Sequence, residues 1–238
     1  NTTCDYDPEE IRRQFSISTA VAPLEYAGCK INLLDTPGFF DFAGEVIEAL
    51  RVADGAVIVC SAKSGMSVGA EKAWKYCEAN KLPRILYISK TDEENSDYNA
   101  AFETLRQTFG KNIAPVAAPI WDDDKKVVGI IDVLNKRAYD VQNGTRREIP
   151  VPDNKKDVLE ELYGALVESV AETNEEFMER YFNGETFTYA EMVQGLHSGV
   201  KDLSLFPVVC GSSFSGLGTK MLLDSIVNFL PSPLESRP

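Results

Sequence analysis

The sequence predicts an α/β protein built on a doubly wound, mostly parallel sheet. Short apolar runs at 56–60 and 84–89 are typical of strands buried on both faces of a parallel sheet. Apolar residues at helical spacing follow each of these runs, and a third run at 205–210 also precedes a helical pattern. Strands that alternate with helices of this length indicate βαβ units, and hence this fold class.

The N-terminal part supplies the first elements of the predicted core. Residues 1–15 are polar, and Asp7-Pro8-Glu9-Glu10 marks a short helical turn. We expect the remaining core elements, in chain order, to be strands at 16–26 and 30–35 and helices at 45–53, 69–80 and 98–109. The strand at 30–35 is expected to be buried and to run directly into a sharp turn.

From about residue 111 the pattern changes to short strands. They are predicted at 116–120, 127–133, 137–141 and 145–149, and Asn143-Gly144 is a hairpin signal between the last two. Two helices follow. One carries Val158, Leu162, Leu166 and Val170, and the other opens with the capping box Thr188-x-x-Glu191. We therefore expect a core over 1–110, an α+β insertion subdomain over 111–203 and a return to the core over 204–238.

Composition narrows the class of function. The net charge of −13 argues against a nucleic-acid groove in this segment, because phosphate contacts need clustered Lys and Arg. No apolar run approaches the ~18 residues of a membrane span, and no secretory leader opens the chain. Five cysteines without a CxxC pair indicate reduced thiols, so we expect a cytoplasmic protein. The chain begins with Asn1, which suggests a piece of a longer protein.

Three polar loops each follow a predicted strand. They are Asp35-Thr36-Pro37-Gly38, Ser89-Lys90-Thr91-Asp92 and Gly211-Ser212-Ser213-Phe214. Ligands of open parallel sheets lie outside the carboxyl ends of the strands, so all three loops can converge on one ligand. Any one of them alone could be an ordinary polar strand terminus. Their occurrence in this order favours a nucleotide site.

The residue types in two of these loops fit particular contacts. Asp35 can accept from magnesium-bound water, and Gly38 lets a backbone N–H approach a phosphate without a Cβ in the way. Asp92 can accept from both the N1–H and the exocyclic amine of guanine, while the Lys90 stem packs on the base. Adenine presents the wrong edge for this carboxylate.

With further motifs, the chain resembles the GTP-binding domain of translational GTPases, specifically elongation factor G and its paralogues. The further motifs are Asp41-Phe42-x-x-Glu45-Val46, Leu50-Arg51-Val52-x-Asp54-Gly55-Ala56 and Leu230-Pro231-Ser232-Pro233. Ribosomal-protection proteins share the core motifs, but Gly69-x-Glu71-Lys72-Ala73-Trp74 looks more like an elongation factor G paralogue.

The resemblance implies a P-loop-NTPase-type fold that binds GTP or GDP with Mg²⁺ and acts on the ribosome. It further implies that the insertion could dock a ribosomal stalk protein. The nucleotide-binding residues that it implies are Asp35, Gly38, Ser89, Lys90, Asp92, Ser212, Ser213 and Phe214, and the metal ligands are Ser16 and Asp35.

Four departures limit what the resemblance carries over. No stretch reads G-x-x-x-x-G-K-[ST], so the phosphate-binding loop is missing, and we expect a truncated N-terminus rather than natural loss. Phe39 stands where the family has a water-orienting His, and is expected to be a packing aromatic. Arg13-Gln14-Phe15-Ser16-Ile17 replaces Arg-Gly-Ile-Thr-Ile, which keeps a hydroxyl at Ser16 but loses a glycine. Ser89 replaces the Asn of Asn-Lys-x-Asp.

Three functions follow from these observations. The leading hypothesis is a guanine-nucleotide switch on the ribosome with slow or absent hydrolysis, because Phe39 can neither donate nor accept a hydrogen bond. The second is a competent translocation-type GTPase in which another group orients the water. The third is an interaction module that no longer uses nucleotide, although Lys90 and Asp92 argue against it.

Overall fold

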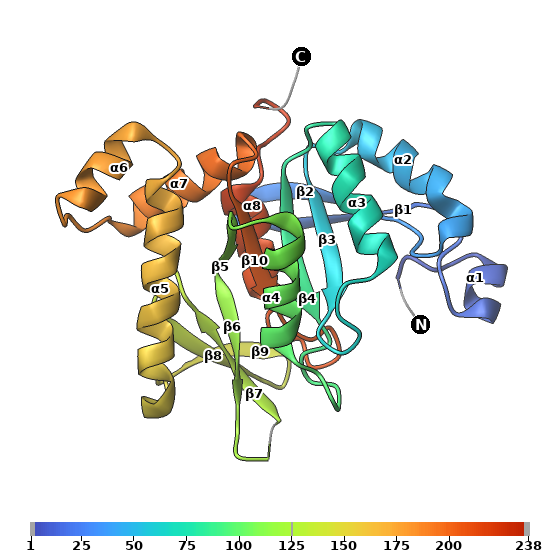
Figure 1. Cartoon of the computed structure of the whole chain (residues 1–238). Helices are drawn as coiled ribbons and strands as arrows, with labels where there is room; N and C mark the ends of the chain where they lie inside the picture. Colours follow the sequence, from blue (N-terminus) through green and yellow to red (C-terminus); the bar gives the residue numbers. More distant parts are fainter. Residues whose placement is uncertain (1–2, 125, 236–238) are drawn as a thin grey trace.

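The central layer of the molecule is a four-stranded parallel sheet. The computed structural model describes residues 3–124 and 126–235. The sheet has the order β3-β4-β10-β5, and its strands are β3 (Ala56–Ser61), β4 (Arg84–Ser89), β10 (Phe206–Cys210) and β5 (Ile113–Pro115). Helices α3 (Val68–Ala79) and α4 (Tyr98–Phe109) cover the face nearer the viewer in Figure 1, and α8 (Thr219–Phe229) packs on the other face. The doubly wound α/β fold is confirmed.

The N-terminal part forms a small sheet of its own, separate from the parallel sheet. Helix α1 (Pro8–Arg13) is followed by β1 (Ala20–Tyr26) and β2 (Cys29–Asp35), which form a two-stranded antiparallel sheet. In the described ranges neither strand pairs with β3. The 3₁₀ turn η1 (Phe40–Phe42) and helix α2 (Ala43–Val52) then lead into the parallel sheet.

Two expectations about this part were wrong. The first strand begins at Ala20 rather than at residue 16, because the N–H groups of residues 17–19 donate to glutamate side chains instead of to a neighbouring strand. The second strand is not buried, since Lys30, Asn32 and Leu33 are exposed. Among the described strands it pairs with β1 alone, so it lacks the neighbouring strands that would shield its side chains from solvent.

Strand β3 also departs from its prediction. Ile58 and Cys60 are buried, but Val59 on the opposite face is 56% exposed. Among the described strands β3 pairs only with β4, and its other edge forms no ladder with the separate β1–β2 sheet. The edge of β3 and the outer edge of β2 therefore both keep unpaired backbone groups in this structure.

The insertion is an antiparallel sheet backed by helices. Its strands are β6 (Ala117–Trp121), β7 (Val127–Asp132), β8 (Arg137–Gln142) and β9 (Thr145–Ile149), and its helices are α5 (Lys156–Ala171), α6 (Glu175–Phe182) and α7 (Tyr189–Lys201), with a 3₁₀ turn η2 (Asp153–Lys155). The hairpin at Asn143-Gly144 is confirmed by positive φ at both residues, and so is the capping box of Thr188 and Glu191. Helix α6 was not predicted.

The strand β5 bears on the boundary between core and insertion. It lies within the range 111–203 assigned to the insertion, yet it pairs in parallel with β10 of the core sheet. The division into 1–110, 111–203 and 204–238 stays a prediction. We propose that the insertion begins after Pro115, because the antiparallel pairing of β6 starts at Ala117.

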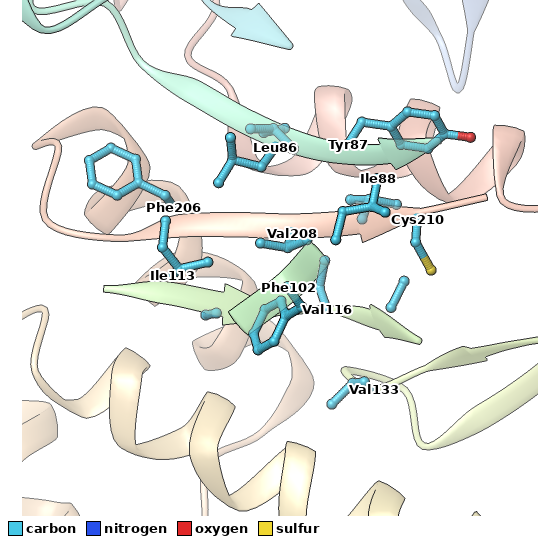
Figure 2. Close-up of a cluster of buried hydrophobic side chains, with 14 of the residues drawn as sticks. Leu86, Tyr87, Ile88, Phe102, Ile113, Val116, Val133, Phe206, Val208 and Cys210 are labelled. Atoms are coloured by element: carbon cyan, nitrogen blue, oxygen red, sulfur yellow. The ribbon is translucent and has the colours of Figure 1, made fainter. Parts of the chain in front are cut away.

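A shared apolar core joins the two parts. Figure 2 shows side chains of β4 and β10, among them Leu86, Ile88 and Val208, facing Phe102 of α4 and Val133 beyond the insertion strand β7. Burial of each such side chain stabilises the fold by about 1.5–3 kcal/mol. The buried phenol of Tyr98 donates to the Ala117 carbonyl at 2.8 Å, which satisfies its polar atom inside this core.

The β1–β2 hairpin is tied to the rest of the molecule at its tip. The Tyr26 hydroxyl donates to Asp224 of α8 at 2.6 Å, and the Arg146 guanidinium of β9 donates to the other oxygen of Asp224 at 2.8 Å. One carboxylate thus joins the hairpin, the core helix and the insertion. Burial and the bond to Asp224 raise the pKa of Tyr26 to about 12, so this phenol stays protonated.

The helices of the described residues are of ordinary globular length, up to the 16 residues of α5. None of them combines the length and the apolar character that crossing a membrane requires.

Candidate functional site

The second predicted loop leaves the carboxyl end of β4 and is fixed by its neighbours. The Ser89 hydroxyl donates to the Cys60 carbonyl of β3 at 2.9 Å. On the other side, the Thr91 amide donates to the Gly211 carbonyl of the third loop at 3.3 Å. Ser89 therefore ties the start of this loop to strand β3, although it is shorter than the Asn of the family pattern. Asp92 lies exposed at the outer end of this loop.

Lys90 adopts an unusual backbone conformation in this loop. Its φ is +59°, a left-handed value that L-residues adopt at some cost. The ammonium lies 3.6 Å from the Glu93 carboxylate, which also accepts from Lys63 at 3.1 Å. These pairs are exposed and contribute little to stability, but they place the Lys90 stem along the loop. The bond from Lys63 lowers the pKa of Glu93.

Lys63 and Glu93 were missed by the sequence reasoning. A signal for Lys63 was available, because it lies two residues after the end of strand β3, while Lys90 directly follows the end of β4. Nothing in the sequence placed Glu93 between the two ammonium groups, since that depends on the turn made by Lys90.

The third loop is packed at its base and open at its tip. The Gly211 amide donates to the Ile88 carbonyl at 3.0 Å, and an added Cβ there would clash with the Leu217 carbonyl oxygen. Ser212 is buried, and its hydroxyl accepts from the Ser215 amide at 3.2 Å. Ser213 is exposed, and Phe214 is 97% exposed. A large aromatic ring at the tip of the third loop is thus almost fully exposed to solvent.

The first loop carries Asp35 and Gly38 at the end of β2. Asp35 and Gly38 are exposed, and no heavy atom lies within 4 Å of a Cβ built on Gly38. The protein itself therefore does not require glycine here, and a requirement would have to come from a ligand close to the backbone. In the described part of the chain, no hydrogen bond joins this loop to the second or third loop. A hydrogen bond thus joins the second loop to the third, and the described residues show no such bond from the first loop to either.

Ser16 and Asp35, the two expected metal ligands, contact two residues that are neighbours in the sequence, Asp5 and Cys4. The Ser16 hydroxyl donates to Asp5 at 2.7 Å. Burial raises the pKa of the neighbouring Cys4 thiol, and the charge of Asp35 and a hydrogen bond to it raise it further. The contacts of Cys4 and Asp5 place the hydroxyl and the carboxylate in one region.

The donor chemistry of this region fits Mg²⁺. A carboxylate and a hydroxyl are hard oxygen donors, and Mg²⁺ commonly takes one or two protein ligands with nucleotide phosphates and waters completing the shell. The described residues contain no cluster of three or more His, Cys, Asp or Glu side chains suited to hold a metal by themselves.

Phe39 sits in an aromatic contact rather than in a hydrogen-bond network. Its ring centroid lies 4.7 Å from that of Phe15, and Phe42 is 6.3 Å from Phe15. Phe39 remains 55% exposed. A phenyl ring supplies neither a donor nor an acceptor, so this position cannot orient a water molecule by hydrogen bonding.

The segment after Ser16 is tied to α2. The Thr19 amide donates to the Glu45 carboxylate at 2.6 Å, and the Thr19 hydroxyl donates to the Glu45 carbonyl at 3.3 Å. The loop that carries Ser16 and the helix that follows Phe39 are therefore linked by main-chain and side-chain bonds.

Comparisons with known proteins agree with this geometry. The family model described as the elongation factor Tu GTP binding domain matches residues 1–232. The crystal structure of ttk003000868 from Thermus thermophilus is similar with a TM-score of 0.93 and 38% sequence identity, over 99% of this chain and 35% of that chain. The present chain thus spans about a third of the length of that protein.

The match to the family model, together with the parallel sheet and the second and third loops at its edge, identifies the GTP-binding domain of a translational GTPase. The chain belongs to the elongation factor Tu GTP-binding domain family, over nearly its whole length.

Proposed function

We propose that this domain is the guanine-nucleotide switch of an elongation factor G-like protein that acts on the ribosome in the cytoplasm, with slow hydrolysis. The observation that carries the proposal is the pair of joined loops at the ends of β4 and β10. They present Lys90, Asp92 and Phe214 at one edge of the sheet. Asp92 would accept from the N1–H and amine of guanine, and Lys90 and Phe214 would pack on the base.

The phosphate side of the site would be completed by Asp35, Gly38 and Ser16. A bound Mg²⁺ neutralises charge on the β- and γ-phosphates during transfer. Ser16 would give it a hydroxyl oxygen, and Asp35 would accept from a water on the ion. The Gly38 amide would approach the γ-phosphate, which fits the open space around that residue.

We propose further that the strand and loop that hold the phosphates come from outside residues 1–238. The unpaired edges of β2 and β3 support this, because a parallel strand inserted between them would join the two sheets into one. The exposed face of β3 at Val59 would then be covered by the helix that follows such a loop.

Phe39 is the reason to expect slow hydrolysis. GTP hydrolysis depends on a group that orients the attacking water, and Phe39 offers none. Nucleotide binding without rapid turnover still serves a switch, because the bound nucleotide biases the order of the loops.

The insertion is a candidate docking surface for a ribosomal stalk protein. A groove of about 460 Å³ runs between α4 and α5, with apolar walls that include Phe102, Trp121 and Leu162. Glu161 and Glu168 of α5 line the groove together with Arg106, Lys111 and Lys155, so it offers a partner charges of both signs around its apolar walls.

Isothermal titration calorimetry, in which nucleotides are added to the native protein that carries this domain, tests the proposal. We expect GDP and GTP to bind in the presence of Mg²⁺ and ATP not to bind. Absence of guanine-nucleotide binding would overturn the switch and leave the interaction module as the better account.

A further inference from the structure

Glu10 is the one residue of helix α1 that the rest of the protein buries. It is only 3% exposed, while its neighbours on the helix are exposed. A carboxylate is costly to bury unless hydrogen bonds replace its water. The contacts of Glu10 therefore have to be accounted for individually.

Three backbone amides donate to the Glu10 carboxylate. One oxygen accepts from Ile17 at 2.8 Å and from Ser18 at 3.1 Å, and the other accepts from Asp7 at 3.2 Å. The bonds from Ile17 and Ser18, in that order, lower the pKa of Glu10, so it is charged at neutral pH. Charge-assisted bonds of this kind are stronger than those between neutral groups.

A capping role explains only one of these bonds. The oxygen that faces Asp7 closes the capping box of α1. The other oxygen binds the two amides that directly follow Ser16, beyond the end of the helix. The chain turns back between them at Gln14, which has the left-handed values φ 59° and ψ 39°.

The result is a segment whose three successive amides, directly after the candidate metal ligand, are held by glutamate side chains. Glu10 holds Ile17 and Ser18, and Glu45 holds the next amide, that of Thr19. The Ser16 hydroxyl then projects to Asp5, in the region of Asp35. None of these anchors involves a nucleotide or a metal ion.

We infer that Glu10 is a positioning residue, which presents the Ser16 hydroxyl to the magnesium ion by fixing the two amides that follow it. The inference rests on the proposed function, because the metal role of Ser16 is part of that function. Glu10 itself does not touch the ion or the nucleotide. Loss of its carboxylate lets the 14–18 segment move and weakens Mg²⁺ binding, as loss of a residue that orients a metal ligand commonly does.

The test is the Mg²⁺ dependence of binding of a fluorescent GDP analogue to the native protein that carries this domain. Glu10→Ala is expected to raise the Mg²⁺ concentration for half-maximal tight binding by about 10-fold or more, with affinity in EDTA unchanged. Glu10→Gln keeps one acceptor oxygen and is expected to lie between Glu10→Ala and the wild type. The matched control is Glu9→Ala, which removes only exposed pairs with Arg12 and Arg13.

A double-mutant cycle separates positioning from a general folding role. If Glu10 acts through Ser16, Glu10→Ala in a Ser16→Ala background leaves the Mg²⁺ requirement where Ser16→Ala alone puts it. Amide hydrogen exchange at Ile17 and Ser18 should also accelerate in Glu10→Ala and not in Glu9→Ala.

An unchanged Mg²⁺ requirement in Glu10→Ala, with normal nucleotide binding by the wild type, overturns the inference alone. An equal loss of affinity with and without Mg²⁺ overturns it as well, because that result assigns Glu10 to folding. No nucleotide binding by the wild type overturns the proposed function and, with it, the role of Glu10 toward the ion.

Discussion

The rings of Phe15 and Phe39 are in contact, with centroids 4.7 Å apart and planes inclined by 60°. Phe15 lies in the segment that carries Ser16, and Phe39 follows Gly38 in the first strand-end loop. Two loops that a switch protein orders through its nucleotide are thus joined here by an aromatic contact. Such a pair contributes about 0.5–1.5 kcal/mol beyond the burial of its surface. Phe39 therefore has a packing role, and we propose that it stands where rapid hydrolysis would need a polar side chain.

Asp92→Asn should change which base the site prefers. The carboxylate of Asp92 can accept from two donors of guanine, whereas an amide offers one acceptor and one donor. We expect affinity for GDP to fall by about 10-fold to 100-fold and affinity for the xanthine nucleotide, which has a carbonyl in place of the amine, to rise. Competition binding with both nucleotides measures this.

The matched control for Asp92→Asn is Glu94→Gln, at an exposed position two residues later. It changes the net charge by the same amount and is expected to leave both affinities unchanged. Equal losses in the two variants would mean that the loop contributes only its charge.

Gln14→Gly should stabilise the protein. Gln14 has φ +59° at the end of α1, where a side chain costs roughly 1–2 kcal/mol and glycine adopts the conformation freely. The greater freedom of glycine in the unfolded chain offsets part of this gain. We expect a net increase of about 0.5–1 kcal/mol in the free energy of unfolding, read from the denaturant midpoint at constant m-value.

Arg13→Gly is the comparison for this prediction. It places glycine one residue earlier, inside the helix, where it should destabilise by about 1 kcal/mol. A loss of stability in Gln14→Gly would show that the Gln14 side chain makes up for its backbone conformation.

Glu191 should make the stability of the insertion depend on acid pH. It accepts from Arg180 at 2.6 Å and from the Thr188 amide at 2.7 Å, and the bond from Arg180 is the main cause that lowers the pKa of Glu191 to about 2. A lowered pKa stabilises the folded state fully above the ordinary value of 4.5, and this contribution is lost as the pH falls toward 2.

Thermal unfolding of the wild type and of Glu191→Gln between pH 7 and pH 2 measures this contribution. We expect the difference between the two melting midpoints to be constant down to about pH 5 and then to shrink. Glu185→Gln, which removes a longer contact of the same Arg180, should give a smaller difference. A difference that does not vary with pH would contradict the role assigned to the Glu191 charge.

Much of the fold followed from local sequence signals. The run 84–89 is apolar from Ile85 to Ile88 between Arg84 and Ser89, and the structure makes it the strand β4 with the same bounds. Asn143-Gly144 and Thr188 with Glu191 specify a turn and a helix start through their own chemistry, so they were predicted correctly.

The features that the sequence did not reveal depend on distant neighbours. Burial of β2 was expected from its apolar residues, but the exposure of Leu33 follows from which strands lie beside it. Strand β5 has three residues, too few for a periodic pattern, and is defined by its pairing with β10. The contact of Glu10 with Ile17 depends on the left-handed turn at Gln14. A glycine at this position would have indicated such a turn, but the sequence has glutamine.

Hydrolysis of GTP in a single turnover, by the native protein with ribosomes, tests the central claim most directly. The account predicts slow hydrolysis by the wild type and an increase of about 100-fold or more in Phe39→His, because histidine restores a group that can orient water. Phe40→His, at the next exposed position, is the control and should remain slow. Rapid hydrolysis by the wild type, unchanged or reduced in Phe39→His, would contradict the claim that Phe39 limits this switch.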